Sequence, residues 1–207
     1  MSQSTDAWNK IFKQEGRVFT EPHEDMPGLV RLLKDHQAKT ILDLGCGSGR
    51  HTVYFAQQGF SVYGLDNSPQ AIELTRQWLA DEGLQSDLKL QSMTERLPYE
   101  DAFFDAVVSV QVIHHAPIST IKDIVHEICR VLKVGGYVFV TVTMLKHHKE
   151  SFEEIEPNTF VPSSGPEKGL PQHCFTPQEL REVFGAFEIS DIHIDGTEHY
   201  CLLGFKP

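Results

Sequence analysis

The residues with the clearest chemical potential lie in one stretch, where an apolar run ends at an acidic side chain and three alternating glycines follow. The stretch is Ile41-Leu42-Asp43-Leu44-Gly45-Cys46-Gly47-Ser48-Gly49-Arg50. A helical pattern begins at Thr52, so the sequence predicts a strand, a tight turn and a helix. Glycine lacks a Cβ and adopts positive φ without strain, which would let a ligand approach the bare backbone. The alternative is a tight strand-to-helix turn without a ligand.

A second acidic residue follows at the spacing that suits a nucleoside. Asp66 ends the next apolar run, 21 positions after Gly45. A carboxylate at this distance can accept hydrogen bonds from the two hydroxyls of a ribose. The alternative is that Asp66, with Asn67 and Ser68, only caps the following helix.

The glycine spacing and the charge of Asp43 indicate which nucleoside. The glycines run G-x-G-x-G, whereas dinucleotide sites usually have G-x-G-x-x-G. Asp43 lies two residues before Gly45, where a carboxylate would repel a pyrophosphate. It would attract the ammonium and sulfonium groups of S-adenosylmethionine, because opposite charges attract strongly in a partly desolvated cleft.

Strand and helix patterns alternate from residue 38 to 143, which predicts a parallel sheet with helices on both faces. The expected strands are 40–44, 60–65, 87–90, 104–110 and 137–142, and the expected helices are 6–14, 26–36, 52–58, 69–82 and 118–132. The Pro- and Gly-rich stretch 146–174 is expected to be irregular, either as a substrate-side lid or as a disordered segment. A capping box then starts a helix at Thr176, and Asp195-Gly196-Thr197 is expected to join a final hairpin of strands 187–194 and 200–205.

Five motifs in this order resemble those of the class I S-adenosylmethionine-dependent methyltransferases that act on small molecules. They are Leu42–Gly49, Gly64–Ser68, Leu97–Val107, Val112–His115 and Arg130–Gly136. The resemblance implies a Rossmann-like α/β fold: a seven-stranded, mostly parallel sheet of order 3-2-1-4-5-7-6 with strand 7 antiparallel. It implies a single domain over 1–207, with a helical arm (1–37), a cofactor-binding core (38–143), a substrate-side lid (144–175) and a final helix and hairpin (176–207).

The resemblance also implies roles at the cofactor. The glycine turn would meet the methionine moiety, Asp43 would face its amino group, and Asp66 would bind the ribose. Relatives often bind adenine with an aspartate where this chain has Met93, so Met93 would pack on the ring. The implied cofactor-binding set is Asp43, Gly45, Cys46, Gly47, Gly49, Asp66, Asn67, Met93, Thr94 and Gln111. Gln111 is equally compatible with a polar strand end that faces solvent.

Methyl transfer is a displacement at a carbon that the cofactor activates, and the protein contributes orientation, desolvation and sometimes a base. His114 and His115 follow the fourth strand and are the expected catalytic residues, one of them as a general base. The alternative is that both are loop residues that cap the next helix. The expected substrate-side residues are Trp8, Phe12, Arg17, Phe19, Glu156, Asn158 and His173, although Trp8 and Phe12 would also suit a helix packed on the core.

Composition narrows the partners. The 207 residues carry a formal charge of -11, which disfavours nucleic acid and anionic membranes as partners. Met1–Lys10 lacks an apolar signal core, and four dispersed cysteines suit reduced thiols, so a cytoplasmic monomer or homodimer is expected. Eleven histidines, His147-His148 among them, show no zinc spacing, so no metal is expected. The alternatives in function are a nicotinamide-dependent oxidoreductase and a non-catalytic S-adenosylmethionine-binding module.

Overall fold

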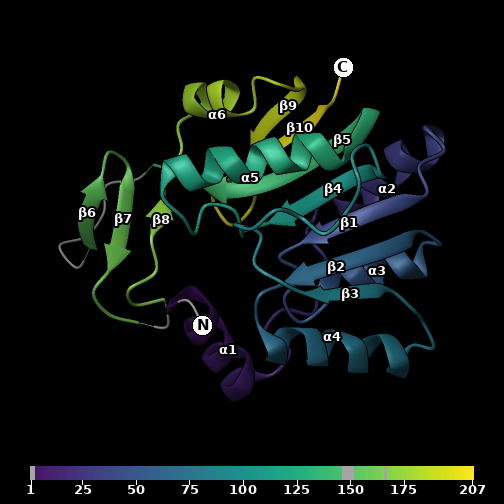
Figure 1. The fold of residues 1–207 in the computed structure, drawn as a ribbon, viewed down its shortest axis with the longest axis horizontal. Coiled ribbons are helices and arrows are strands. Elements are labelled where there is room, and N and C mark those ends of the chain that lie inside the picture. The colour runs from purple at the N-terminus through teal and green to yellow at the C-terminus, as the bar shows by residue number, and fades with distance from the viewer. Residues whose placement is uncertain (1–2, 146–151, 166) are drawn as a thin grey trace.

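The computed structural model describes residues 3–145, 152–165 and 167–207, and its centre is a seven-stranded sheet. The strand order is β3-β2-β1-β4-β5-β10-β9, with β10 antiparallel to both of its neighbours (Figure 1). The predicted order and the antiparallel last strand are therefore confirmed. The strands are β1 (Thr40–Leu44), β2 (Ser61–Asp66), β3 (Asp87–Leu90), β4 (Phe104–Val110), β5 (Leu132–Thr143), β9 (Glu188–Ile194) and β10 (His199–Phe205).

Helices cover both faces of the sheet, because each strand of its centre carries apolar side chains on both sides. On β1, Ile41 packs in one core cluster, whereas Leu42 and Leu44 pack in the other. The first cluster includes residues of α2 and α3, and the second includes residues of α5 and α6. The helices are α1 (Gln3–Glu15), α2 (Met26–Asp35), α3 (Arg50–Gln57), α4 (Pro69–Asp81), α5 (Ile118–Val131) and α6 (Pro177–Val183).

The topology creates a crevice beside the glycine turn. Strand β1 pairs in parallel with both β2 and β4, so the chain leaves β1 toward one side of the sheet and later returns on the other. In open parallel sheets, ligands bind at such a switch point, outside the carboxyl ends of the strands. The arrowheads of β1, β2 and β4 point toward the end of the molecule where α1 lies (Figure 1).

The stretch expected to be irregular contains a second, three-stranded sheet, so that prediction was wrong. Strands β6 (Phe152–Glu156), β7 (Thr159–Pro162) and β8 (Gln172–His173) pair antiparallel in this order. This small sheet lies beyond the carboxyl ends of the central strands (Figure 1). The prolines misled the prediction, although Pro162 is the last residue of β7 and lies beyond the residues that pair with β8. Residues 146–151, with His147-His148, and residue 166 lie outside the described residues.

The boundary between α5 and β5 also differs from the prediction. The helix ends at Val131 and the strand begins at Leu132, five residues earlier than expected. Gly135 and Gly136 do not form a separate loop but an irregularity within the strand, where the register to β4 shifts. Gly136 is required there, because an added Cβ would lie 2.9 Å from the carbonyl oxygen of Lys133.

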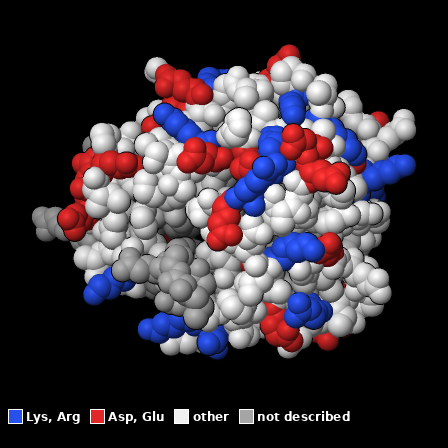
Figure 2. Space-filling view, viewed as in Figure 1, with Lys and Arg blue, Asp and Glu red and all other residues white. Residues whose placement is uncertain are grey.

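The surface carries both signs of charge. On the face that Figure 2 shows, the Lys and Arg side chains of the described residues are scattered among Asp and Glu rather than gathered in one basic patch. Among the described residues, no helix combines the length and the apolar character needed to cross a bilayer.

Candidate active site

A cavity of about 400 Å³ lies at the carboxyl ends of the central strands. It is bounded by the glycine turn after β1, the end of β2, the segment after β4 and helix α1. The structure thus brings together elements that are far apart in the sequence. Twelve of the predicted residues line it: Trp8, Phe12, Phe19, Gly45, Cys46, Gly47, Asp66, Asn67, Met93, Gln111, His114 and His115.

The glycine turn depends on the absence of side chains. Gly45 has φ +78°, and a Cβ there would lie 2.3 Å from a γ-carbon of Val112. Gly47 has φ +54°, and its Cβ would lie 3.3 Å from the ring of Phe12. The turn therefore brings bare backbone to the cavity while Val112 and Phe12 close over it.

The Asp66 carboxylate ties this turn to the next helix. One oxygen accepts a hydrogen bond from the Gly47 N–H (2.9 Å), and the other accepts from the Ser68 N–H (2.8 Å). Burial raises the pKa of Asp66, and these backbone donors oppose the rise. Each carboxylate oxygen can accept more than one hydrogen bond, so Asp66 can hold the turn and still bind hydroxyl groups of a ligand. Ser68 also caps α4 by accepting from the Ala71 N–H, so the helix-cap alternative describes Ser68 rather than Asp66.

The two histidines after β4 lie side by side, His114 buried and His115 half-buried. Their ring centroids are 4.3 Å apart, and the rings of His115 and Trp8 are packed edge to face with their centroids 5.4 Å apart. Burial lowers the pKa of His115 to about 4, and burial together with the neighbouring His115 lowers that of His114 well below its ordinary value. Both rings are therefore neutral at physiological pH.

His115 is arranged as a proton acceptor. Its ring hydrogen-bonds the backbone of Pro171, whereas Nδ1 is buried and has no hydrogen-bond partner among the described residues. The nitrogen that donates to Pro171 is therefore Nε2, which leaves the lone pair of Nδ1 free. The Nδ1 atom of His114 is likewise without a partner in the described part of the chain. The backbone carbonyl of His114 accepts from the His173 N–H at 2.8 Å, which fixes this segment.

Aromatic side chains from the N-terminal arm form the apolar wall of the cavity. Trp8 and Phe12 come from α1, and Phe19 follows it. The helix is anchored by Asn9, whose side-chain oxygen accepts from Ser68 Oγ and from the Gln70 N–H, each at 3.1 Å. The arm thus covers the crevice and also packs on the core, since Phe12 is 6% exposed.

The structure does not bring seven of the predicted residues to the cavity lining: Asp43, Gly49, Thr94, Arg17, Glu156, Asn158 and His173. Gly49 instead precedes α3 with φ +99°, where a Cβ would clash with Thr75 at 2.9 Å. Thr94 bonds its neighbour Ser92 at 2.8 Å.

The other predicted residues outside the cavity lining have structural roles elsewhere. Arg17 pairs with Asp81 at 2.7 Å, away from the crevice. Glu156 accepts from the Ile118 N–H at 2.7 Å and so holds the start of α5 to the small sheet. Asn158 occupies a turn with φ +62°, and His173 is fully buried with its Nδ1 2.7 Å from Thr159 Oγ1.

The main residue that sequence reasoning missed is His199. It is the first residue of β10, directly opposite Thr143 in the pairing with β5, and both residues line the cavity. The sequence could have indicated this position. The last strand is antiparallel, so its first residue lies at the edge of the sheet where the parallel strands end. Glu167 and Gln172, which hydrogen-bond each other, reach the cavity from the segment after β7. No motif in the sequence marked these two.

Comparisons with known proteins agree with this geometry. A family model described as "Methyltransferase domain" matches residues 42–140. The ubiquinone biosynthesis O-methyltransferase of Idiomarina loihiensis is 28% identical over 193 residues, which cover 90% of this chain and 78% of that protein. That of an Azoarcus species is 36% identical over 101 residues, which cover 49% of this chain and 42% of that protein.

Solved structures share the fold. The Burkholderia thailandensis 1,6-didemethyltoxoflavin-N1-methyltransferase, determined with its substrate and S-adenosylhomocysteine, superposes with a TM-score of 0.72 at 19% identity. The superposition covers 98% of this chain and 87% of that one. The chain belongs to the class I S-adenosylmethionine-dependent methyltransferases. Its cofactor is S-adenosylmethionine.

The donor set of this methyltransferase fits a cationic nucleoside. Asp43 lies behind the glycine turn, 1% exposed, and accepts from Thr52 Oγ1 at 2.6 Å. Burial raises the pKa of Asp43 to about 6, and the Thr52 hydrogen bond and the Arg50 charge offset only part of that rise. Burial destabilises the ionised form of this carboxyl group, and a positive charge nearby would stabilise it. The ammonium and sulfonium of the cofactor would supply one.

Asp43→Asn is expected to stabilise the ligand-free methyltransferase. A folded-state pKa of about 6, against the ordinary 3.8, corresponds to roughly 3 kcal/mol of destabilisation when the group is ionised. Because the folded-state pKa is raised, the parent is destabilised only where Asp43 is ionised. The variant should therefore exceed the parent in free energy of unfolding by the full amount above about pH 6, and this difference should disappear as the pH falls toward 3.8. Urea unfolding of both proteins at several pH values measures the difference.

Asp105→Asn is the matched control with the opposite sign. Partial burial opposes ionisation of Asp105, but hydrogen bonds from Lys133, Thr40 and Lys39 lower its pKa to about 2. Asp105 therefore stabilises the fold above the ordinary pKa of 3.8, and its replacement should destabilise the protein at neutral pH. An Asp43→Asn variant that is less stable than the parent at pH 8 would contradict the burial argument.

Proposed function

We propose that this chain transfers the methyl group of S-adenosylmethionine to a hydroxyl oxygen of a small aromatic molecule. The observation that carries the proposal is the neutral ring of His115, which lines the same cavity as the glycine turn and whose Nδ1 has no hydrogen-bond partner among the described residues. A hydroxyl acceptor needs such a base, whereas a thiol or amine needs little help. The names of the two curated relatives, both O-methyltransferases, support an oxygen acceptor.

Four groups would hold the cofactor. Asp66 would accept hydrogen bonds from the ribose hydroxyls, and the backbone of Gly45 and Gly47 would lie against the methionine moiety. Asp43 would act on the positive end from behind the turn, directly or through water. Met93 lines the cavity at the position where relatives often have an aspartate, and its side chain would pack on the adenine ring. The cofactor, once bound, supplies an electrophilic methyl carbon and a thioether leaving group.

The acceptor would occupy the part of the cavity between α1 and the two histidines. Trp8, Phe12 and Phe19 present ring surfaces there, which suits an apolar or aromatic molecule. The arm 1–37 and the segment 144–175 would together cover the acceptor within one domain. Such cover excludes water and orients the reacting oxygen toward the methyl carbon.

The chain's part in the reaction would be a proton transfer. His115 would accept the hydroxyl proton as the acceptor oxygen takes the methyl group. The bound cofactor would supply that methyl group together with a thioether leaving group, so the products would be a methyl ether and S-adenosylhomocysteine. The imidazolium of His115 then returns its proton to water, which its low pKa favours.

Two measurements test the proposal. Isothermal titration calorimetry should show micromolar binding of S-adenosylmethionine and S-adenosylhomocysteine, with NADH as the comparison ligand. Incubation with S-adenosylmethionine and a panel of catechols and other phenols should give methyl ethers by mass spectrometry. Binding of NADH alone would favour the oxidoreductase alternative. Cofactor binding with no product from phenols, thiols or amines would favour the non-catalytic module.

A further inference from the structure

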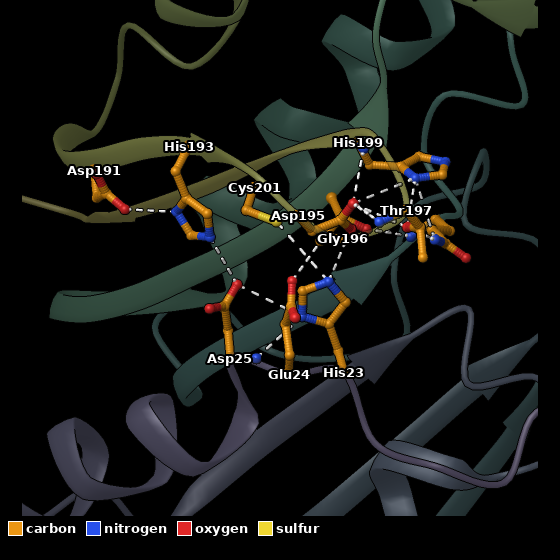
Figure 3. Close-up of polar contacts among 12 residues, drawn as sticks. His23, Glu24, Asp25, Asp191, His193, Asp195, Gly196, Thr197, His199 and Cys201 are labelled. Carbon is orange, nitrogen blue, oxygen red and sulfur yellow. Dashed lines mark hydrogen bonds and ion pairs between the residues drawn. The ribbon is translucent and has the colours of Figure 1, made fainter.

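A second cluster of polar side chains lies outside the cavity lining, around Cys201 (Figure 3). Cys201 on β10 and His193 on β9 are directly opposite each other in the antiparallel pair, so their side chains share one face. Asp25, the residue before α2, reaches the same point, and its Oδ2 lies 3.1 Å from His193 Nε2. One ligand atom from each of the three lies within 4.8 Å of the other two.

The neighbouring pair, His23 and Asp195, is explained by hydrogen bonds alone. With Nδ1 of His23 accepting from the Asp25 N–H (3.3 Å), its Nε2–H donates to Asp195 Oδ2 (3.0 Å). The other oxygen of Asp195 accepts from the N–H groups of Thr197 and His199. Both side chains are therefore satisfied, and the pair clamps the hairpin turn to the loop before α2.

His193 is held in a different way. Its Nδ1 lies 2.7 Å from Asp191 Oδ2, so the ring proton belongs on Nδ1. The lone pair of Nε2 then points at the Asp25 carboxylate, 3.1 Å away. Two acceptors at this distance repel each other unless a cation, a proton or a metal ion, lies between them. Metal-binding histidines characteristically donate their other N–H to a carboxylate, as His193 does to Asp191.

We propose that Asp25, His193 and Cys201 bind a zinc ion, with Asp191 orienting the histidine. A carboxylate oxygen, an imidazole nitrogen and a thiolate sulfur form a donor set that suits zinc and disfavours calcium and magnesium. Zinc bonds of about 2.0–2.3 Å at tetrahedral angles place ligand atoms roughly 3.3–3.7 Å apart. The three ligand atoms lie within 4.8 Å of one another and would move closer together on binding the ion.

The surroundings also suit an ion. Asp25 and His193 have side chains 28% and 40% exposed, which gives access from solvent and room for water as a fourth ligand. Cys201 is fully buried beneath them and would lose its thiol proton to the metal. The ion would tie the start of α2 to the β9–β10 hairpin, and that hairpin carries His199 to the cavity. Its role would be structural, because none of the three ligands lines the cavity.

The test uses the full chain, freed of any tag and of metal by chelator dialysis. Titration with zinc chloride is expected to show one ion bound per chain, and zinc is expected to raise the melting temperature. Cobalt(II) is expected to give a thiolate-to-metal charge-transfer band. Cys201→Ser should abolish the band, and His193→Gln should abolish stoichiometric binding. Asp191→Asn should weaken binding by about 10- to 100-fold.

Matched controls separate the site from other thiols and histidines. Cys129→Ser and His126→Gln, both outside the cluster, should leave zinc binding unchanged, and circular dichroism should report native folding of each variant. If Cys201→Ser does not fold, His193→Gln carries the test, because that side chain is partly exposed. The proposal is overturned if the parent protein binds no zinc, or if the thiolate band survives in Cys201→Ser. It is also overturned if binding survives in His193→Gln and is lost in His115→Gln.

Discussion

Asp66→Ala is expected to lower the affinity for S-adenosylhomocysteine by at least about 100-fold. Two hydrogen bonds from ribose hydroxyls to a carboxylate are worth about 1.5–3 kcal/mol each, and 100-fold corresponds to roughly 2.7 kcal/mol. The substitution also frees the Gly47 and Ser68 N–H groups that the carboxylate now holds at 2.9 Å and 2.8 Å. The glycine turn would then lose its anchor as well as its ligand contact. Isothermal titration calorimetry measures the change.

Two further variants serve as comparisons for this affinity measurement. Asp66→Asn keeps one acceptor oxygen and should lose less affinity than Asp66→Ala. Asp123→Asn removes an exposed carboxylate on α5 and should leave the affinity unchanged. Circular dichroism would show whether each protein is folded. Parental affinity in a folded Asp66→Ala protein would place the ribose elsewhere and would remove the main support for the cofactor assignment.

His115→Ala is expected to lower kcat for a hydroxyl acceptor by about 10²- to 10⁴-fold, the usual contribution of a general base. Binding of S-adenosylhomocysteine should change little, because the base acts on the acceptor. The pH profile of the parent enzyme supplies a second readout. The ring is neutral above its pKa of about 4, so kcat should persist through the neutral range and fall as the pH drops through about 4.

His126→Gln is the control for this experiment, since His126 is an exposed histidine on α5. His114→Ala tests the neighbouring ring, whose Nδ1 is also without a partner among the described residues. Full loss in His114→Ala with normal turnover in His115→Ala would move the base to His114. Undiminished turnover in both variants would remove the two histidines from the mechanism and favour a thiol or amine acceptor.

The fold could be predicted because its signals are local and repeated. Strand β4 is almost entirely apolar and lies between β1 and β5, and the buried stripe of α5 recurs at helical spacing, as at Ile121, Ile124 and Ile128. Capping chemistry marked helix starts correctly at Ser68 and Thr176, where each side chain accepts from a backbone N–H. These features depend on neighbours within a few residues, which a sequence displays directly.

Two parts of the architecture could not be predicted in this way. The small sheet of β6, β7 and β8 forms from short strands with little apolar alternation, and its pairing joins segments across a proline-rich stretch. The early start of β5 depends on Gly135 and Gly136 being accommodated beside β4, a tertiary constraint. Local propensity carries little information where distant pairing decides the conformation.

The class of fold, the position of the glycine turn, and the presence of Asp66, His114 and His115 at strand ends could all be predicted from the order of the residues. This was possible because the carboxyl ends of parallel strands lie at the same edge of the sheet, irrespective of the conformation of the loops. The packed fold was needed to show that Asp43 lies behind the cavity lining and that His199 is part of that lining. It was also needed to show that Asp25, His193 and Cys201 converge. Those placements arise from side-chain packing between elements up to 176 positions apart, from Asp25 to Cys201. No local pattern in the sequence encodes such distances.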